Sequence, residues 1–201
     1  LTSNLELVSS LLDSGMNPDT QNDKNKTLLY LATENNDLGM VDLLLRKGAL
    51  VDFPFGAENE NKVMEQNEFK VIDPTPFLYA AAHGQVEILN RLVQEKPNLE
   101  IRNDYGGNAL IPAAEKGHYE TAKLLLEKTD IDVNFVNYLG WTALLEVVLL
   151  SKNRSMQLKM AKLLLDHGAD INIKDNNGVS ALVHVRKNNH EELTLLLESY
   201  L

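Results

Sequence analysis

The apolar residues of the chain fall into short stripes at helical spacing, and the stripes come in pairs. Between residues 75 and 93, a thin stripe of small and apolar side chains precedes a glycine, and a denser stripe follows it. Spacings of three and four residues place such side chains on one face of a helix. Glycine often ends a helix because it tolerates a left-handed turn. The pattern predicts two short antiparallel helices here, with the residues Phe77, Ala80 and Ala81, then Gly84, then Val86, Ile88, Leu89 and Leu92.

The same pattern recurs at a nearly constant interval. A small hydroxyl or amide residue opens each copy, at Thr27, Thr75, Asn108, Thr142 and Ser180, so the steps are 48, 33, 34 and 38 residues. Clusters of Asn, Asp and Gly between the copies favour turns. A base period of 33 predicts a repeat protein in which the excess residues lie in loops. We therefore place a long insertion at 53–71 and a longer link between two helices at about 152–157.

Several of these segments resemble the ankyrin repeat. The stretches that carry the resemblance are DPTPFLYAAAHGQVEILNRLV from Asp73, NALIPAAEKGHYETAKLLLEK from Asn108 and AKLLLDHGADINIKDNNGVSAL from Ala161. The resemblance implies an all-α repeat solenoid of stacked antiparallel helix pairs with short β-turn or hairpin loops. It implies one array over 1–201, with a partial repeat at about 1–21, five repeats at 22–52, 70–102, 103–136, 137–173 and 174–201, and the 53–71 insertion between repeats.

The chain departs from the family pattern at identifiable positions. The proline that follows the opening Thr is present only at Pro76, and the glycine between the helices is replaced by Asn36, Ser151 and Asn189. Asn tolerates a positive φ, so we expect Asn36 and Asn189 to turn the chain as glycine would. The insertion mixes Phe and acidic residues, and we predict that it either caps a repeat edge or borders the binding face.

Charge and composition exclude several classes of function. The formal net charge is -10, which opposes binding to nucleic acids or to anionic membrane surfaces. The longest apolar runs are far shorter than a membrane span. With no Cys, the chain has no disulfides, thiol nucleophiles or Cys-based metal sites. The chain starts at Leu1 rather than Met, so we expect a trimmed or processed terminus, and a cytoplasmic location is favoured while secretion or surface anchoring stays open.

No group of residues has the spacing of a catalytic, metal or cofactor site. His118, His167 and His190 stand at or near positions where the family pattern itself has His, which favours structural roles. No His pair has the zinc-protease spacing, and DINIKDNNG lacks the alternating oxygen ligands and closing Glu of a calcium loop. Gly106 and Gly107 lack the Lys and Ser or Thr of a phosphate loop. We predict a protein that is not an enzyme and that carries no cofactor.

The resemblance implies a binding surface on the concave side, made of turn tips and the outer positions of the first helices. Tyr105, Tyr138 and Trp141 supply three of the twelve aromatic residues there, as interface hot spots or as packing residues that seal neighbouring turns. The predicted binding positions are Asp23, Lys24, Lys26, Glu34, His83, Asp104, Tyr105, Glu115, Lys116, Tyr138, Leu139, Trp141, Leu149, Leu150, Asn176, Asn177 and Lys187.

The resemblance implies a protein-protein interaction module, and the sequence does not identify its partner. The alternative is a regulatory or inhibitory partner of an enzyme, of the immunity type, and catalysis by the chain itself ranks below both. We expect a monomer, with weak self-association at the apolar C-terminal end around Tyr200 and Leu201.

Overall fold

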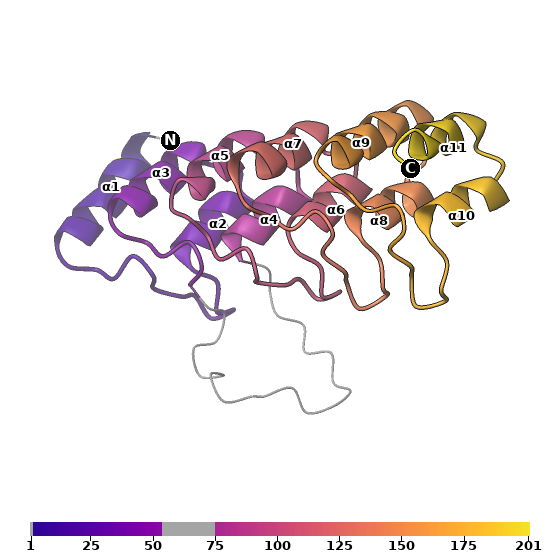
Figure 1. Ribbon diagram of the computed structural model, residues 1–201. Coiled ribbons are helices and arrows are strands. Elements are labelled where there is room, and N and C mark those ends of the chain that lie inside the picture. The colour runs from indigo at the N-terminus through magenta and orange to yellow at the C-terminus, as the bar shows by residue number, and fades with distance from the viewer. Residues whose placement is uncertain (1, 54–74) are drawn as a thin grey trace. The chain divides into compact units, whose positions relative to one another are not determined.

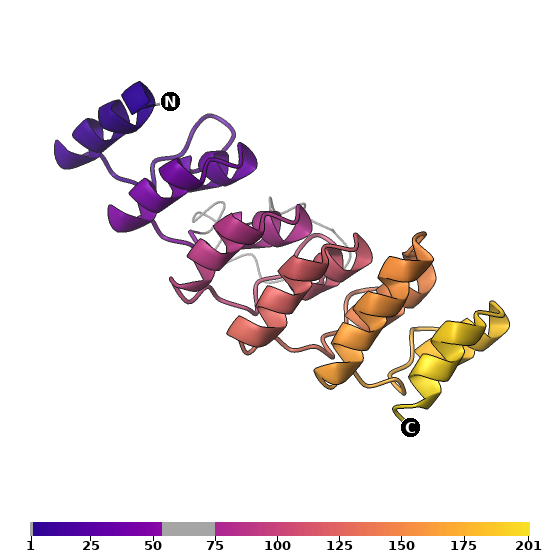
Figure 2. The same ribbon diagram turned by 90° about the horizontal axis from the view of Figure 1, so that it is seen from above.

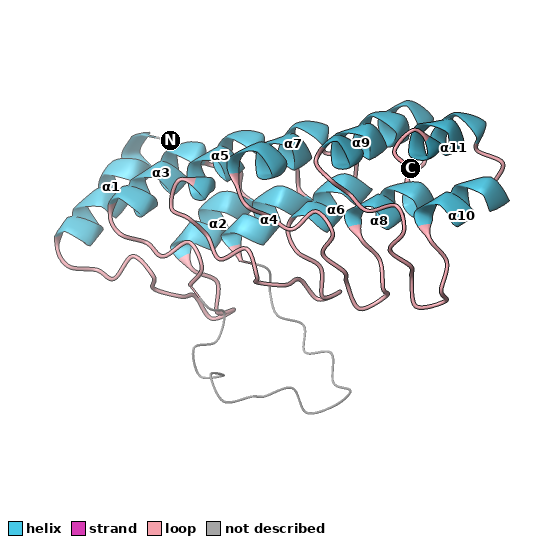
Figure 3. Ribbon diagram, viewed as in Figure 1, coloured by secondary structure: helices cyan, strands magenta, loops and turns pink. Residues whose placement is uncertain are grey.

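A computed structural model describes residues 2–53 and 75–201 of the chain. The predicted insertion lies outside the described residues, apart from Phe53 at its start. Within the described ranges the chain forms eleven helices and no sheet (Figure 3). The helices group into two compact bodies, which are described separately: an N-terminal body of the described residues up to Ala80 with 85–98, and a C-terminal body of 81–84 with 99–201.

The N-terminal body contains α1 (Thr2–Asp13), α2 (Leu28–Glu34), α3 (Leu38–Arg46), most of α4 (Pro76–Ala82) and α5 (Val86–Val93). Within it, α3 packs against both α1 and α5, and α2 packs against α3. Arg91 of α5 donates to Asp42 of α3 at 3.0 Å, and the rings of Tyr30 and Tyr79 meet edge to face at 5.4 Å. Neighbouring helix pairs in this body are therefore joined by polar and aromatic contacts as well as by apolar packing.

The C-terminal body contains α6 (Leu110–Glu115), α7 (Tyr119–Lys128), α8 (Ala143–Leu150), α9 (Arg154–Asp166), α10 (Ala181–Lys187) and α11 (Glu191–Glu198). Its first helices α6, α8 and α10 pack side by side in one layer, and its second helices α7, α9 and α11 form the other (Figure 1). Leu110, Leu125, Leu144 and Leu164 are fully buried between the layers. The predicted stacking of antiparallel helix pairs is confirmed.

A side-chain cap starts most of the first helices. The hydroxyl oxygens of Thr27, Thr75 and Thr142 each accept from the backbone N–H three residues on, at 3.1 to 3.3 Å. This satisfies one of the donors that a helix leaves open at its start. The residues that mark the repeat period in the sequence are thus the helix caps. Ser180 holds the same place in the last repeat but makes no side-chain capping bond.

Four turns between repeats lie in the described ranges, and each is closed by one amide or carboxylate side chain. Asn103 Oδ1 accepts from the backbone N–H groups of Tyr105 and Gly107 at 3.0 and 2.9 Å. Asn22, Asn137 and Asp175 bond in the same way to the residues two and four positions on. The fourth residue of every such turn has a positive φ, and the set is Asn25, Gly106, Gly140 and Gly178. The Asn, Asp and Gly clusters therefore encode one turn repeated four times.

The links within the helix pairs correct one prediction and confirm another. Asn36 and Asn189 have φ of 54° and 51°, so they turn the chain as glycine would. The link after α8 is only Ser151–Asn153, as short as the links after α6 and α10, so the predicted longer link at 152–157 is wrong. The additional residues extend the helices instead, and α9 reaches 13 residues. Asn153 explains this, because its side chain caps α9 at Met156 and starts the helix early.

Candidate functional site

Three successive turns of the C-terminal body form a row, which we call the turn row: 103–107, 137–141 and 175–179. The backbone N–H of Tyr138 donates to the carbonyl of Tyr105 at 2.9 Å, and the Asn176 amide donates to the carbonyl of Tyr138 at 3.1 Å. Each turn is thus fixed internally by its Asn or Asp and externally by its neighbour. The row is a preorganised surface, which reduces the entropy that binding would cost.

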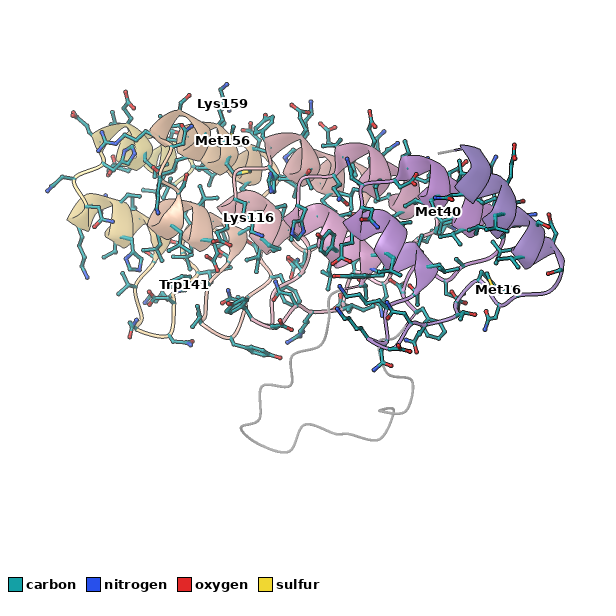
Figure 4. The ribbon with its side chains drawn as sticks, turned by 180° about the vertical axis from the view of Figure 1, so that it is seen from behind. Met16, Met40, Lys116, Trp141, Met156 and Lys159 are labelled. Atoms are coloured by element: carbon teal, nitrogen blue, oxygen red, sulfur yellow. The ribbon has the colours of Figure 1, made fainter. Side chains whose placement is uncertain are left out.

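Aromatic side chains of the turn row divide into exposed and packed ones. The side chain of Tyr105 is 69% exposed, and that of Tyr138 is 43% exposed. The Tyr138 ring also lies against the preceding turn, so closely that a Cβ added to Gly106 would meet it at 2.6 Å. Trp141 is half-buried on the turn side of α8 (Figure 4). The packing interpretation therefore holds in part for Tyr138, while nearly half of its surface still faces solvent.

The other predicted positions of the C-terminal body lie in two places. Asp104, Leu139, Asn176 and Asn177 are exposed within the turn row. The other predicted positions lie at or just after the C-terminal ends of the first helices, near the links within the helix pairs. There, Lys116 donates to the carbonyl of Ala82 at 3.1 Å. Leu150 is exposed and Leu149 is half-buried. The structure therefore separates the link positions from the turn row: His83, Glu115, Lys116, Leu149, Leu150 and Lys187.

In the N-terminal body, the predicted positions surround the turn at Asn22. Asp23 and Lys24 are exposed at its tip. Lys26 forms an ion pair with Glu34 at 2.8 Å and lies over the ring of Tyr30 at 4.6 Å. These contacts hold Lys26 close to the helix, so Asp23 and Lys24 are the more accessible charges of this turn.

Sequence reasoning missed Glu146, the charged residue within the apolar run of α8. Its side chain is only 6% exposed; Oε1 accepts from the Asn137 amide at 2.9 Å, while Oε2 is buried without a hydrogen-bond partner among the described residues. Burial, with a smaller contribution from the charge of Glu115, raises the pKa of Glu146 to about 7. An acidic residue inside ALLEVVLL was the signal that could have revealed it.

Three of the histidines contribute to local structure. His190 Nδ1 accepts from the backbone N–H of Leu193 at 3.3 Å and so caps α11. His184 Nε2 pairs with Asp175 Oδ2 at 2.8 Å, and the His118 ring fills the space beside Gly84. Over residues 2–53 and 75–201, no group of three or more His, Asp or Glu is arranged to hold a metal ion.

No helix in the described ranges is long and apolar enough to cross a membrane.

Comparison with known proteins gives a consistent result. Sequence profiles of ankyrin repeats match residues 2–45, 57–137 and 77–175. The Escherichia coli ankyrin repeat protein YahD is 30% identical over 193 residues, covering 96% of this chain and 89% of YahD. A human transient receptor potential channel of subfamily A, member 1, is 30% identical over 149 residues, which are 72% of this chain but 13% of the channel.

Two solved structures are similar over almost the whole chain. The ankyrin repeat protein EF0377 has a TM-score of 0.86 and 35% identity, covering 98% of this chain and 93% of its own. An ankyrin repeat domain from Acinetobacter baumannii AYE has a TM-score of 0.86 and 32% identity, covering 99% and 93%.

Proposed function

The chain belongs to the ankyrin repeat family, and we propose that it is a protein-binding module whose principal contact surface is the turn row of the C-terminal body. Ankyrin repeats are protein-binding modules, and the rigid stacked scaffold presents turn residues for contact. The observation that carries the proposal is the row itself. It sets Tyr105 and Tyr138 on neighbouring turns joined by a backbone hydrogen bond, with both rings partly exposed.

The chemistry of the row indicates what kind of surface it would bind. Tyr side chains lose little conformational entropy on binding and offer both apolar area and a hydroxyl, so they are enriched among residues that dominate binding energy. Asp104 is exposed in the row and adds negative charge in a chain of net charge -10. A partner surface with basic residues around an apolar centre complements this arrangement.

A double substitution tests the proposal. Tyr105→Ala combined with Tyr138→Ala should reduce partner capture from an extract of the source cell by at least tenfold, while the circular dichroism spectrum stays unchanged. Tyr200→Ala is the matched control, because Tyr200 is an exposed tyrosine at the end of α11, away from the turn row. Mass spectrometry would identify the captured protein. If that protein is an enzyme inhibited by the wild-type chain, the regulatory alternative is the correct one.

Two results would count against the turn row. Undiminished capture by the double variant would place the contact elsewhere on the molecule. Loss of helical signal in the double variant would show that the tyrosines act as packing residues rather than as hot spots.

A further inference from the structure

The links at the ends of α8 and α10 border a pocket that the turn row does not include. It lies inside the C-terminal body and has a volume of about 240 Å³. Figure 2 shows the two links at the same end of their helix pairs, in orange and yellow. Val148, Val185 and Leu193 supply apolar lining, and Lys152, Arg154 and His190 supply polar lining. A pocket with both kinds of lining can hold a group that is charged at one end and apolar at the other.

His190, one of the residues that line this pocket, has a buried ring nitrogen without a hydrogen-bond partner among the described residues. Because His190 Nδ1 accepts the backbone N–H of Leu193, the neutral ring carries its proton on Nε2. That Nε2 is buried and has no hydrogen-bond partner among the described residues, and His190 as a whole is 8% exposed. A buried donor without an acceptor is destabilising and uncommon in folded proteins. A ligand atom that accepts a hydrogen bond would remove this cost.

The charge around the pocket favours an anion. Lys152 and Arg154 are exposed at its rim, and neither forms an ion pair with any residue in the described part of the chain. The start of α9, at Arg154, points its open N–H groups and its partial positive charge toward the link. Glu191 and Glu192 follow His190 in the first turn of α11, and their exposed negative charges act against anion binding.

The walls of the pocket are held in place by a buried amide. Gln157 of α9 donates to the carbonyls of Val147 and Val148 at the end of α8, at 2.9 and 3.1 Å. The link between α8 and α9 is therefore fixed from both sides, since Asn153 also caps α9. A binding site that is ordered beforehand loses less entropy when it is filled.

We propose that this pocket binds the C-terminal carboxylate of a partner protein whose last residue has an apolar side chain. A chain terminus carries a carboxylate and a side chain on the same carbon, which matches the donors and the apolar wall within one small volume. An Asp or Glu side chain would offer only the carboxylate. The site is separate from the turn row, so either surface can bind without the other.

Calorimetric titration of the whole chain with short peptides tests the proposal. The probe is acetyl-Gly-Gly-Leu with a free carboxylate, and the comparison ligand is the same peptide with a C-terminal amide. The free acid should bind at least tenfold more tightly than the amide, because a charge-assisted hydrogen bond increases affinity by about tenfold. The affinity should fall as salt is added.

Three variants separate the contributions. His190→Asn keeps a side-chain oxygen that can cap α11 but removes the ring donor, so binding should weaken by about tenfold with helicity retained. Lys152→Gln with Arg154→Gln removes the rim charges and should weaken binding at least as much. Lys159→Gln with Lys174→Gln is the matched control: it removes the same charge at exposed positions outside the pocket lining, and Lys159 projects from the outer side of α9 (Figure 4).

Each other outcome would overturn the proposal in a defined way. Equal binding of acid and amide, or no binding of either, would show that the pocket does not recognise a carboxylate. Isovalerate binding as tightly as the peptide would assign the pocket to free carboxylic acids. Inorganic phosphate binding as tightly would assign it to anions in general, and unchanged binding by His190→Asn would remove the buried donor from the site.

Discussion

Replacement of Glu146 by Gln tests whether burial of one carboxyl makes the C-terminal body less stable as the pH rises. The pKa of Glu146 is raised from its ordinary value of 4.5 to about 7 in the folded protein. The folded state therefore holds a proton that the unfolded state releases over this pH range. Since the folded state binds more protons, the free energy of unfolding falls between about pH 4.5 and pH 7 and levels off above.

The size of this effect follows from the shift. One pKa unit corresponds to about 1.4 kcal/mol. Complete ionisation of Glu146 therefore lowers the free energy of unfolding by about 3 kcal/mol. Roughly 2–3 kcal/mol of that falls between pH 5 and pH 8, because the unfolded carboxyl is already mostly ionised at pH 5. Glu146 is only 6% exposed, so water screens its charge weakly.

Urea unfolding of the wild type and of Glu146→Gln at pH 5 and pH 8 provides the assay. The side chain of Gln can still accept from Asn137, and its own packing cost is the same at both pH values. The variant should therefore gain roughly 2–3 kcal/mol in free energy of unfolding relative to the wild type on going from pH 5 to pH 8, whatever its absolute stability. Trp141 is the only Trp in the chain and immediately precedes the cap of α8, so its fluorescence reports unfolding beside Glu146.

Two further variants define the cause. Glu120→Gln removes one negative charge at an exposed position of α7 and is the control for the loss of a charge as such. Glu115→Gln removes the neighbouring charge and should reduce the effect without abolishing it, because burial is the larger cause. If Glu146→Gln differs from the wild type by the same amount at both pH values, the carboxyl titrates normally and the reasoning from burial is wrong.

Two matched pairs test the repeated turn and the repeated cap, both by urea unfolding. Gly106 and Gly178 have φ of 74° and 75°, so Ala at either should cost roughly 1–2 kcal/mol, and Gly106→Ala should cost more because its Cβ meets the Tyr138 ring. Equal losses at the two positions would mean that the ring moves aside freely. Thr142→Ala should cost about 1 kcal/mol and Ser180→Ala less, since only the Thr142 side chain makes a capping bond. A larger loss at Ser180 would contradict the assignment of the caps.

Much of the fold could be predicted because each repeat carries its instructions within a few consecutive residues. The side chain of Thr142 bonds three residues on, and that of Asn137 bonds two and four residues on. The positive φ at Asn36 followed from the chemistry of Asn alone. The prediction failed at 152–157, where a period count cannot show whether additional residues enter a loop or a helix. The cap at Asn153 decided in favour of the helix.

The candidate surfaces were less predictable than the fold. The sequence placed Tyr138 at a turn tip but left open whether it packs or binds, and the structure shows a ring that touches Gly106 on one side and solvent on the other. It placed Leu149 at an outer position of a first helix on the same binding face as the turn tips, and the structure puts it in the lining of the link pocket. Such assignments depend on which neighbouring repeat covers a side chain, and this information is not local.

By itself, the sequence determined the helix pairs, their caps and their turns, because hydrogen bonds between residues two to four positions apart are encoded where they form. Only the tertiary structure decided how water is excluded. The α8 carboxyl of Glu146 loses its solvent through packing within the C-terminal body, which raises its pKa, and the Nε2 of His190 becomes a buried donor beside a pocket. Desolvation depends on the atoms that several elements bring together, so no single stretch of the chain specifies it.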